Sequence, residues 1–322
     1  MKNAEMVTFG GSGLNRAAEL RVQPDRLAEL RTHPETRFLP LWRGRPLLGG
    51  ASLSGLVLLA PGHDVLSLAT EAPVFLGLEG GAARFAVDIS AWQPDEYDPA
   101  LLKRFFDPTE WRHPGLPDDQ AFCELRAVMA RLTPREAELA ATAKAILQWH
   151  RSHGYCANCG AKSAIFMAGW QRNCPECDTR HFPRTDPVVI MLITHGNDVL
   201  LGRSVGWPDG VYSLLAGFVE PGETLEAAVR REVHEETGIS VGPVGYLASQ
   251  PWPFPASLMV GCSGRALNRE IRIDPDEIED AIWVSREELM MAFAGEKPEL
   301  LPARKGSIAH FLLSNWLADR LD

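Results

Sequence analysis

The spacing of hydrophobic and polar residues divides the chain into stretches of different period. Between residues 36 and 122, short apolar runs are bounded by Gly, Pro or Asp. Such runs are typical of strands in a small β-rich unit, and they cover residues 38–42, 53–60, 65–68, 74–78 and 85–89. The first 35 residues are polar and are expected to be partly loose. We therefore predict an N-terminal β-rich domain over residues 1–120.

Helical spacing replaces this pattern at about residue 121. Apolar residues between Leu125 and Leu132 recur at helical intervals, and Thr133, Pro134 and Glu136 follow them. A threonine N-cap, a proline at the first helical position and a glutamate at the third are the signature of a capped helix. The sequence thus predicts a helical connection over residues 121–152.

Strands and helices alternate in the C-terminal part of the chain, residues 184–318. Apolar residues 188–193, a polar turn and apolar residues 199–201 predict a β-hairpin. Further strands are expected at 241–247, 258–264 and 270–273, and helices at 225–237, from Ser285 and at 308–321. This alternation predicts an α+β domain.

The expected helix 225–237 carries an unusual concentration of acidic side chains. Its apolar residues form one stripe, and Glu232, Glu235 and Glu236 lie opposite that stripe. Residues three and four apart are neighbours on a helix, so these carboxylates repel one another, at the helix end that disfavours anions. A divalent cation with oxygen ligands, such as Mg²⁺, would remove this repulsion. The alternative is a solvated acidic face.

Four of the six cysteines form two pairs with metal-ligand spacing. Each pair has two residues between its cysteines, and fourteen residues separate the pairs Cys156/Cys159 and Cys174/Cys177. Two such pairs complete a tetrahedral four-thiolate shell around structural Zn²⁺, with a β-hairpin between them. Redox-active pairs are the alternative. We predict a zinc ribbon over residues 153–183.

Residues 249–257 alternate prolines with aromatic residues. The segment reads SQPWPFPAS, and its prolines exclude a helix or a central strand. A rigid loop of this kind suits stacking against a planar ring of a ligand. A packed loop covering the sheet is the alternative.

The charge and composition of the chain restrict the binding partners and the cellular compartment that we expect. The net charge of −10 argues against general affinity for nucleic acid, although it leaves room for a local basic patch. No apolar run approaches the roughly 18 residues of a membrane span, and the N-terminus lacks the apolar core of a signal peptide. We expect a cytoplasmic protein without a membrane partner.

The acidic helix and its preceding loop resemble a known family motif. Gly217, Glu223, Arg231-Glu232-Val233, Glu235-Glu236 and Gly238-Ile239 match all nine fixed positions of the Nudix box. The resemblance implies a mixed-sheet αβα sandwich and hydrolysis of a nucleoside diphosphate linked to another group. Arg231 is expected to pair with Glu223 and brace the loop against the helix.

A narrower resemblance comes from the flanking segments. The motif SQPWPFPxS after the box and the four-cysteine ribbon before it are similar to the NADH pyrophosphatase branch of the Nudix family. That branch implies a homodimer that splits NAD(H) into nicotinamide mononucleotide and AMP and removes NAD caps from RNA. Nudix hydrolysis of ADP-ribose or dinucleoside polyphosphates, and a non-catalytic zinc-ribbon binding protein, are the alternatives.

The resemblance also implies roles for individual residues. Glu232, Glu235, Glu236 and Glu277 match catalytic Mg²⁺ or Mn²⁺ ligands, together with the carbonyl group of Ala216, and Glu235 is the expected proton acceptor. The positions that match substrate contacts are Arg126, Phe182, Phe218, Gln250, Pro251, Trp252, Pro253, Phe254, Pro255, Ala256, Ser257 and Ala309. Gly169 stands where some members carry an acidic residue, and the effect of this difference on one polar substrate contact stays open. The preference for NADH or capped RNA and for Mg²⁺ or Mn²⁺ stays open.

Overall fold

The computed structural model describes residues 1–11, 13–94 and 107–321. The chain forms two compact units. The first comprises Met1–Gly10, Thr185–Trp252 and Ser257–Asp322, and the second comprises Gly11–Arg184 with Pro253–Ala256. The boundary between Arg184 and Thr185 lies one residue after the start expected for the C-terminal domain.

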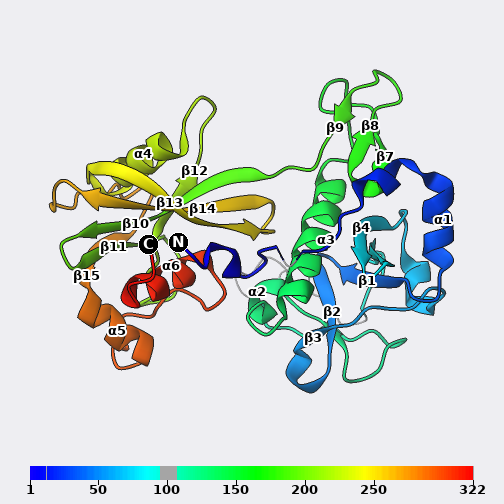
Figure 1. Cartoon of the computed structure of the whole chain (residues 1–322), viewed down its shortest axis with the longest axis horizontal. Coiled ribbons are helices and arrows are strands. Elements are labelled where there is room, and N and C mark those ends of the chain that lie inside the picture. Colours follow the sequence, from blue (N-terminus) through cyan, green and yellow to red (C-terminus); the bar gives the residue numbers. More distant parts are fainter. Residues whose placement is uncertain (12, 95–106, 322) are drawn as a thin grey trace. The chain divides into compact units, whose positions relative to one another are not determined.

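The second unit is built on a six-stranded sheet with one long helix against it (Figure 1). Strand order is β3-β2-β1-β5-β4, and β6 pairs with β2. Alternate residues of β1 face opposite sides: Phe38 and Trp42 enter an aromatic core, and Leu39 and Leu41 pack with helix α3. The strands are β1 (Arg37–Trp42), β2 (Arg45–Gly49), β3 (Gly55–Leu56), β4 (Val74–Glu79), β5 (Ala82–Asp88) and β6 (Ala121–Phe122).

The helices of the second unit agree only in part with the sequence predictions. Helix α3 (Pro134–Ser152) has the expected capping box between Thr133 and Glu136, whereas α2 spans only Leu125–Val128. The N-terminal stretch expected to be loose contains α1 (Pro24–Thr32), which has a proline in its first turn and buries Leu27 and Leu30. The apolar run 65–68 is part of a 3₁₀ helix, Asp64–Leu68, instead of a strand.

Three short strands form the ribbon that follows α3. They are β7 (Ala164–Phe166), β8 (Gln171–Asn173) and β9 (Arg180–His181), in the order β7-β8-β9. The hairpin expected between the two cysteine pairs is therefore confirmed. His150 of α3 anchors the ribbon, because its ring contacts the Gly169 carbonyl at 2.9 Å and Arg172 Nη1 at 3.1 Å.

The first unit is a mixed sheet with helices on both faces. Strand order is β13-β14-β10-β11-β15, β12 pairs with β10, and β10 and β14 are parallel. Helix α4 packs on one face, and α5 and α6 pack on the other, which confirms the αβα sandwich. The elements are β10 (Asp186–His195), β11 (Asp198–Arg203), β12 (Leu215–Phe218), α4 (Leu225–Thr237), β13 (Val241–Trp252), β14 (Ser257–Ala266), β15 (Asp280–Ser285), α5 (Arg286–Ala294) and α6 (Ile308–Leu317).

Three expectations for this unit are wrong. Residues 249–252 belong to strand β13, because β13 is an edge strand and an edge tolerates Pro251. Residues 270–273 are not a strand, since Arg272 N donates to Thr237 O at the end of α4. The last helix ends at Leu317 instead of residue 321, because Asp319 adopts a left-handed backbone conformation with φ 53°.

The N-terminal segment also departs from the expected domain division. Residues 1–10 group with the C-terminal unit instead of with the β-rich domain. Their contacts explain this grouping, since Asn3 Nδ2 donates to Asn315 Oδ1 at 2.7 Å and the Phe9 ring meets Trp252 edge-on at 6.3 Å.

Within the residues described above, no helix is both long and apolar enough to cross a membrane.

Candidate active site

Helix α4 begins after a residue type that favours the start of a helix and ends at one that favours its end. Thr224 Oγ1 accepts a hydrogen bond from Ala227 N at 3.2 Å as the N-cap, and Gly238 ends the helix with φ 68°. Ala228, Val229 and Val233 are fully buried against the sheet. This burial fixes the rotation of the helix and presents the glutamate face away from the core.

Arg231 joins the loop to the glutamate face of α4. Its Nε and Nη2 atoms donate to the two oxygens of Glu223 at 2.7 and 2.8 Å, which is the brace expected from the sequence. Its Nη1 atom contacts Glu232 and Glu235, each at 2.9 Å. The ion pair with Arg231 lowers the pKa of Glu223 to about 2. Glu223 therefore stays ionised and holds the loop at neutral pH.

Glu236 is the member of the acidic cluster whose ionisation is most disfavoured. It is 9% exposed, and its Oε2 atom has no hydrogen-bond partner among the described residues. Burial, followed by the charges of Glu232, Glu277 and Glu235, raises the pKa of Glu236 to about 8. Burial also raises the pKa of Glu232, with smaller contributions from Glu235 and Glu277.

Glu277 comes to this cluster from outside the helix. Asp274 N donates to Glu236 O, and Glu277 N donates to Asp274 O, so the chain after α4 folds back over the C-terminal end of the helix. The charge of Glu277 reaches both Glu232 and Glu236. Glu277 therefore lies close enough to Glu232 and Glu236 for their charges to interact.

Gly217 leaves room for the carboxylate of Glu232. A Cβ atom at residue 217 would lie 1.9 Å from Glu232 Cδ, closer than any two such atoms can approach. The backbone of β12 and the carboxylate thus share one space, and only glycine permits this approach.

These residues fit a hard divalent cation. Four carboxylates with two raised pKa values, one buried oxygen without a partner and a glycine cradle form an oxygen-rich donor set. Glu232, Glu236 and Glu277 would hold the cation, which would satisfy the unpartnered oxygen and offset the repulsion between the carboxylates.

Cation binding is predicted to release the proton of Glu236. The native chain holds this proton up to about pH 8, whereas an ordinary glutamate releases it near pH 4.5. The free energy of unfolding of the metal-free protein should therefore fall as pH rises between these values, by at most about 1.4 kcal/mol per pH unit. The affinity for Mn²⁺ should instead rise with pH, up to about tenfold per unit below pH 8. Calorimetric titration in buffers of different ionisation enthalpy counts the released protons. The Glu236→Gln variant should release fewer, and an unchanged proton count in that variant contradicts the assignment.

The side chain of Gln250, which is expected to contact substrate, lies inside the first unit. It is fully buried, and its Nε2 atom donates to Thr8 O and Gly306 O at 2.8 and 2.9 Å. Its Oε1 atom accepts from Ile308 N at 2.8 Å, at the start of α6. These bonds occupy both ends of its amide and tie three segments of the first unit together.

Replacing Gln250 is therefore predicted to act on stability. The Gln250→Ala substitution leaves buried backbone groups unpaired, and we expect the free energy of unfolding to fall by about 2–4 kcal/mol. Denaturant titration measures this loss. The neighbouring Ser249→Ala substitution serves as the control and should change stability by less than about 0.5 kcal/mol. A raised KM with unchanged stability for Gln250→Ala would instead indicate a substrate contact.

Other expected substrate residues divide between the two units. In the second unit, the guanidinium of Arg126 lies 4.8 Å from the Phe254 ring centre, and Lys144 Nζ lies 5.2 Å from the same ring. Sequence reasoning missed Lys144, because a single lysine on an alanine-rich helix carries no signal. Burial lowers the pKa of Lys144 to about 8. The ring of Phe254 therefore lies beside two cationic side chains.

The remaining expected contacts differ in exposure. Phe218 and Phe182 are 60% and 62% exposed, on the first and second unit respectively, and the Phe218 carbonyl accepts from Arg231 Nη2. Ala216 lies opposite Ile190 in the β10–β12 pair. Ala309, in the first turn of α6, is buried in the core, so its side chain is not available to a ligand.

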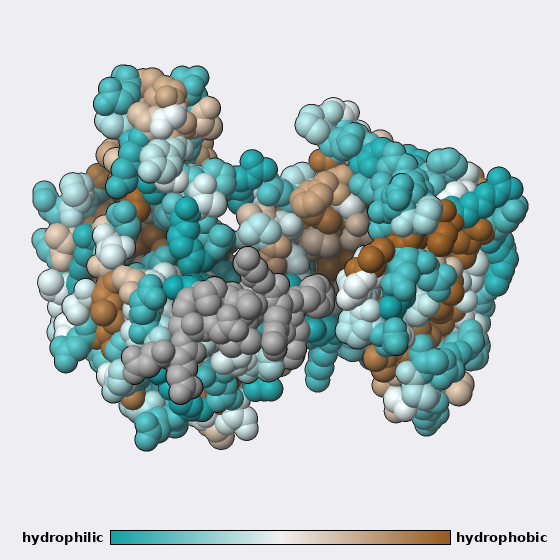
Figure 2. Space-filling view, turned by 180° about the vertical axis from the view of Figure 1, so that it is seen from behind, coloured by the Kyte–Doolittle hydropathy of each residue, from teal (hydrophilic) through white to brown (hydrophobic). Residues whose placement is uncertain are grey.

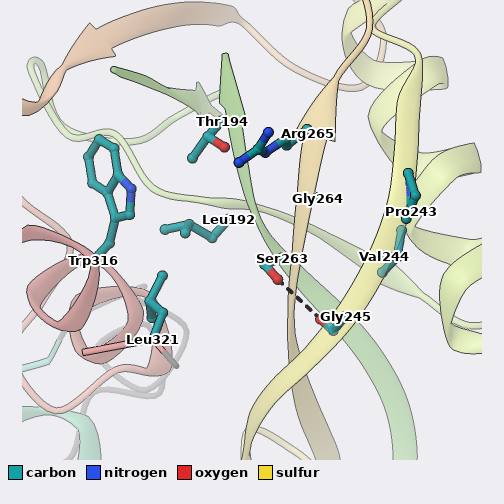
Figure 3. Close-up of a pocket in the computed structure, with 10 residues that line it drawn as sticks. All are labelled: Leu192, Thr194, Pro243, Val244, Gly245, Ser263, Gly264, Arg265, Trp316 and Leu321. Carbon is teal, nitrogen blue, oxygen red and sulfur yellow. Dashed lines mark hydrogen bonds between the residues drawn. The ribbon is translucent and has the colours of Figure 1, made fainter. Parts of the chain in front are cut away.

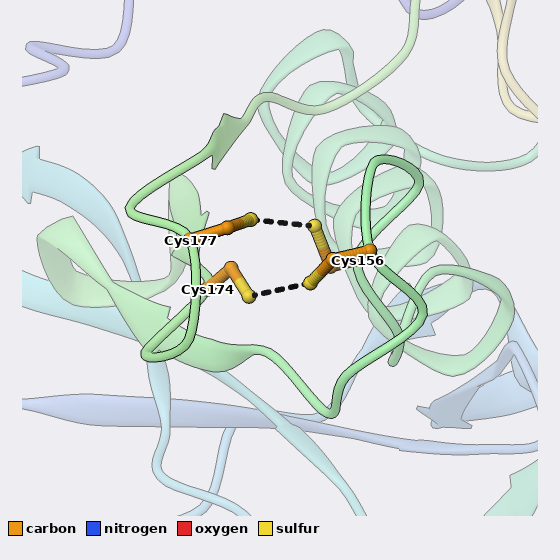
Figure 4. Close-up of side chains that lie close together, drawn as sticks. Cys156, Cys174 and Cys177 are labelled. Atoms are coloured by element: carbon orange, nitrogen blue, oxygen red, sulfur yellow. Dashed lines mark hydrogen bonds between the residues drawn. The ribbon is translucent and has the colours of Figure 1, made fainter.

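The four cysteines of the ribbon converge on one point (Figure 4). Their Sγ atoms lie within 4.8 Å of one another, with Cys156 3.6 Å from Cys177 and Cys159 3.4 Å from Cys174. A tetrahedral Zn²⁺ with Zn–S bonds of about 2.3 Å requires sulfur separations near these values. Burial raises the pKa of the Cys156 thiol, but the N–H groups of Cys159 and Asn158 outweigh it and lower that pKa to about 5. The set fits structural zinc with no open position.

A hollow of about 600 Å³ lies on the other side of the sandwich from α4 (Figure 3). Leu192 and Trp316 belong to the core between the sheet and α6, whereas α4 packs on the opposite face. The hollow contains no acidic side chain, so it is separate from the glutamate cluster. Its lining residues are Leu192, Thr194, Pro243, Val244, Gly245, Ser263, Gly264, Arg265, Trp316 and Leu321.

Three family profiles match consecutive parts of the chain. An NADH pyrophosphatase-like rudimentary NUDIX domain matches residues 35–149, an NADH pyrophosphatase zinc ribbon domain matches 151–182, and a NUDIX domain matches 183–306. The first match adds to the sequence interpretation, which described the N-terminal domain only as β-rich.

Two relatives match over nearly the whole chain, and a third matches over part of it. The NAD-capped RNA hydrolase NUDT12 of Homo sapiens is 35% identical over 96% of this chain and 73% of its own length. The NAD-capped RNA hydrolase NudC of Mycobacterium bovis is 36% identical over 92% and 94%. The mitochondrial NAD(P)H pyrophosphatase NUDT13 of Homo sapiens is 38% identical over 61% and 59%.

The αβα sandwich and the acidic helix, taken with these matches, define a Nudix hydrolase. The chain belongs to the branch of the Nudix family that carries the NADH pyrophosphatase zinc ribbon.

Proposed function

We propose that this chain is a metal-dependent pyrophosphatase that hydrolyses NAD(H) to nicotinamide mononucleotide and AMP and removes NAD caps from the 5′ ends of RNA. The observation that carries the proposal is the glutamate cluster on α4, with its buried, unpartnered Glu236 oxygen. The names of the relatives supply the substrate class: two are NAD-capped RNA hydrolases and one is an NAD(P)H pyrophosphatase.

The protein groups have distinct tasks in this reaction. A divalent cation at Glu232, Glu236 and Glu277 would neutralise phosphoryl oxygens and lower the pKa of water. Glu235 takes the proton of the attacking water, because it is half exposed and stands at the rim of the cluster. Arg231 keeps Glu235 and Glu232 in place through its Nη1 atom.

The cation is proposed to be Mg²⁺ or Mn²⁺, and the ribbon is proposed to hold one Zn²⁺ per chain. Hard oxygen donors favour the former, and four thiolates favour the latter. We also infer a homodimer in a reducing, cytoplasmic setting. None of the six cysteines forms a disulfide, which agrees with a reducing compartment.

A substrate panel tests the proposed function. Purified protein with Mn²⁺ or Mg²⁺ is given NADH, ADP-ribose and a dinucleoside polyphosphate, and the products are separated by chromatography. NADH should be cleaved with the highest kcat/KM. A kcat/KM at least tenfold higher for ADP-ribose or the polyphosphate would mean that this compound, and not NADH, is the substrate. No turnover of any of them would favour a non-catalytic binding protein.

A further inference from the structure

One face of the ribbon sheet is rich in exposed aromatic and basic side chains. Side chains that lie opposite one another in a strand pair project on the same face of the sheet, and alternate residues share a face. Tyr155 pairs with Lys162, and Phe166 pairs with Gln171. Residues 164 and 166 alternate along β7, and Lys162 lies two residues before Ala164. Because Ser163 Oγ accepts a hydrogen bond from Arg172 Nε on the opposite face, Tyr155 and Lys162 lie on the face of Phe166.

Arg180 lies on the same face. Asn173 pairs with both Ala164 and Arg180 across the three strands, which places Arg180 in the row of Ala164. Gln171 Nε2 donates to Asn173 Oδ1 at 2.5 Å, and this bond confirms that residues 171 and 173 project together.

The opposite face of the ribbon is already occupied. Arg172 Nε donates to Ser163 Oγ at 2.8 Å, and Arg172 Nη1 contacts His150 of α3. Arg172 is 5% exposed and Ser163 is 4% exposed. The ribbon therefore packs on α3 through one face. On the other face Tyr155, Lys162, Phe166 and Arg180 are exposed, whereas Gln171 is buried.

Exposure and charge distinguish the open face from ordinary protein surface. Tyr155 is 70% exposed and Phe166 is 53% exposed, whereas rings of this size are usually buried. Lys162 and Arg180 are exposed and pair with no carboxylate among the described residues. The two acidic residues of the ribbon, Glu176 and Asp178, lie in the second cysteine knuckle, outside the three strands. At the upper left of Figure 2, the ribbon shows hydrophobic surface beside hydrophilic surface.

We propose that the face formed by Tyr155, Lys162, Phe166 and Arg180 binds the single-stranded RNA that follows the cap. Aromatic rings stack on bases without sequence preference, and cations between them contact the phosphates. Such a surface matches a flexible polyanion that carries planar bases. The inference rests on the proposed function, because it assigns the RNA part of the same substrate to a second surface.

Oligonucleotide binding tests this face independently of catalysis. The probe is an uncapped, unstructured single-stranded RNA with a 3′ fluorescein, followed by anisotropy. Tyr155→Ala/Phe166→Ala should weaken binding at least about fivefold for each ring removed. Lys162→Ser/Arg180→Ser should make the logarithmic salt dependence shallower by about 1.4, which corresponds to two phosphate contacts. Tyr246→Ala/Arg320→Ser removes an exposed ring and an exposed cation from the first unit and should bind as the unmodified protein does.

Kinetics separate this inference from the proposed function. Both ribbon variants should keep one zinc per chain, an unchanged Tm and NADH turnover within twofold, while kcat/KM for NAD-capped RNA falls. Absence of NADH turnover in the unmodified protein contradicts the proposed function but leaves the binding experiment valid. Equal RNA binding by all variants overturns the inference. Two other results would also overturn the inference. An acidic peptide would displace the labelled RNA at a lower concentration than unlabelled RNA does, or the unmodified protein would self-associate and only the ribbon variants would lose this self-association.

Discussion

Replacing Glu235 by Gln is expected to lower kcat for NADH by about 10²–10⁴-fold, the range attributed to a general base. The substitution keeps the size of the side chain but removes its ability to accept the proton of water. Glu235 is 47% exposed and contacts Arg231 Nη1 at the helix surface, so the fold does not depend on its charge. The measurement is steady-state hydrolysis of NADH at saturating Mn²⁺, together with Tm.

Glu226→Gln provides the matched control for this experiment. Glu226 is exposed on the first turn of the same helix, away from the cluster at its C-terminal end. The control removes the same charge from α4 and should retain kcat within about twofold. If Glu235→Gln keeps kcat within threefold of the unmodified protein, Glu235 is not the proton acceptor.

Loss of the zinc ligands is expected to unfold the ribbon without unfolding the first unit. The ribbon strands are two or three residues long, which is too short for independent stability. Metal binding supplies about 10–16 kcal/mol in comparable zinc-finger peptides. Cys159→Ser should therefore abolish the bound zinc and the hydrogen-exchange protection of residues 171–173, while protection in β10 persists.

Cys123→Ser is the control for the zinc experiment. Cys123 is buried in the second unit, and its Sγ contacts the Ala121 carbonyl at 3.8 Å, a contact that serine preserves. This variant should keep one zinc per chain by elemental analysis. Retention of stoichiometric zinc in Cys159→Ser would exclude the four-thiolate site.

Local signals in the sequence predicted the elements that depend on local interactions. The capping residues Thr133, Thr224 and Ser285 each start a helix as expected, and each side chain accepts a backbone N–H. The Arg231–Glu223 brace is also confirmed, because its partners lie within one loop-and-helix motif. Such features need no knowledge of distant parts of the chain.

Features that depend on long-range pairing were not predicted. Strand β15 was missed, and residues 270–273 were expected to be a strand although the N–H group of Arg272 donates to Thr237 at the end of α4. Glu277 follows this misassigned segment in the chain. Its position in the structure therefore depends on tertiary contacts that the neighbouring sequence does not indicate. The family resemblance assigns Gln250 to substrate, and the local sequence does not indicate its bonds to the carbonyls of Thr8 and Gly306, which are 242 and 56 residues away.

Product analysis of NADH hydrolysis tests the central claim most directly. The protein is incubated with NADH and Mn²⁺, and the products are identified by chromatography and mass spectrometry, with the Glu235→Gln variant in parallel. The account predicts reduced nicotinamide mononucleotide and AMP in equal amounts from the unmodified protein, and at least about a hundredfold slower formation of both from the variant. Intact NADH after prolonged incubation, or cleavage at a bond other than the pyrophosphate, would contradict it.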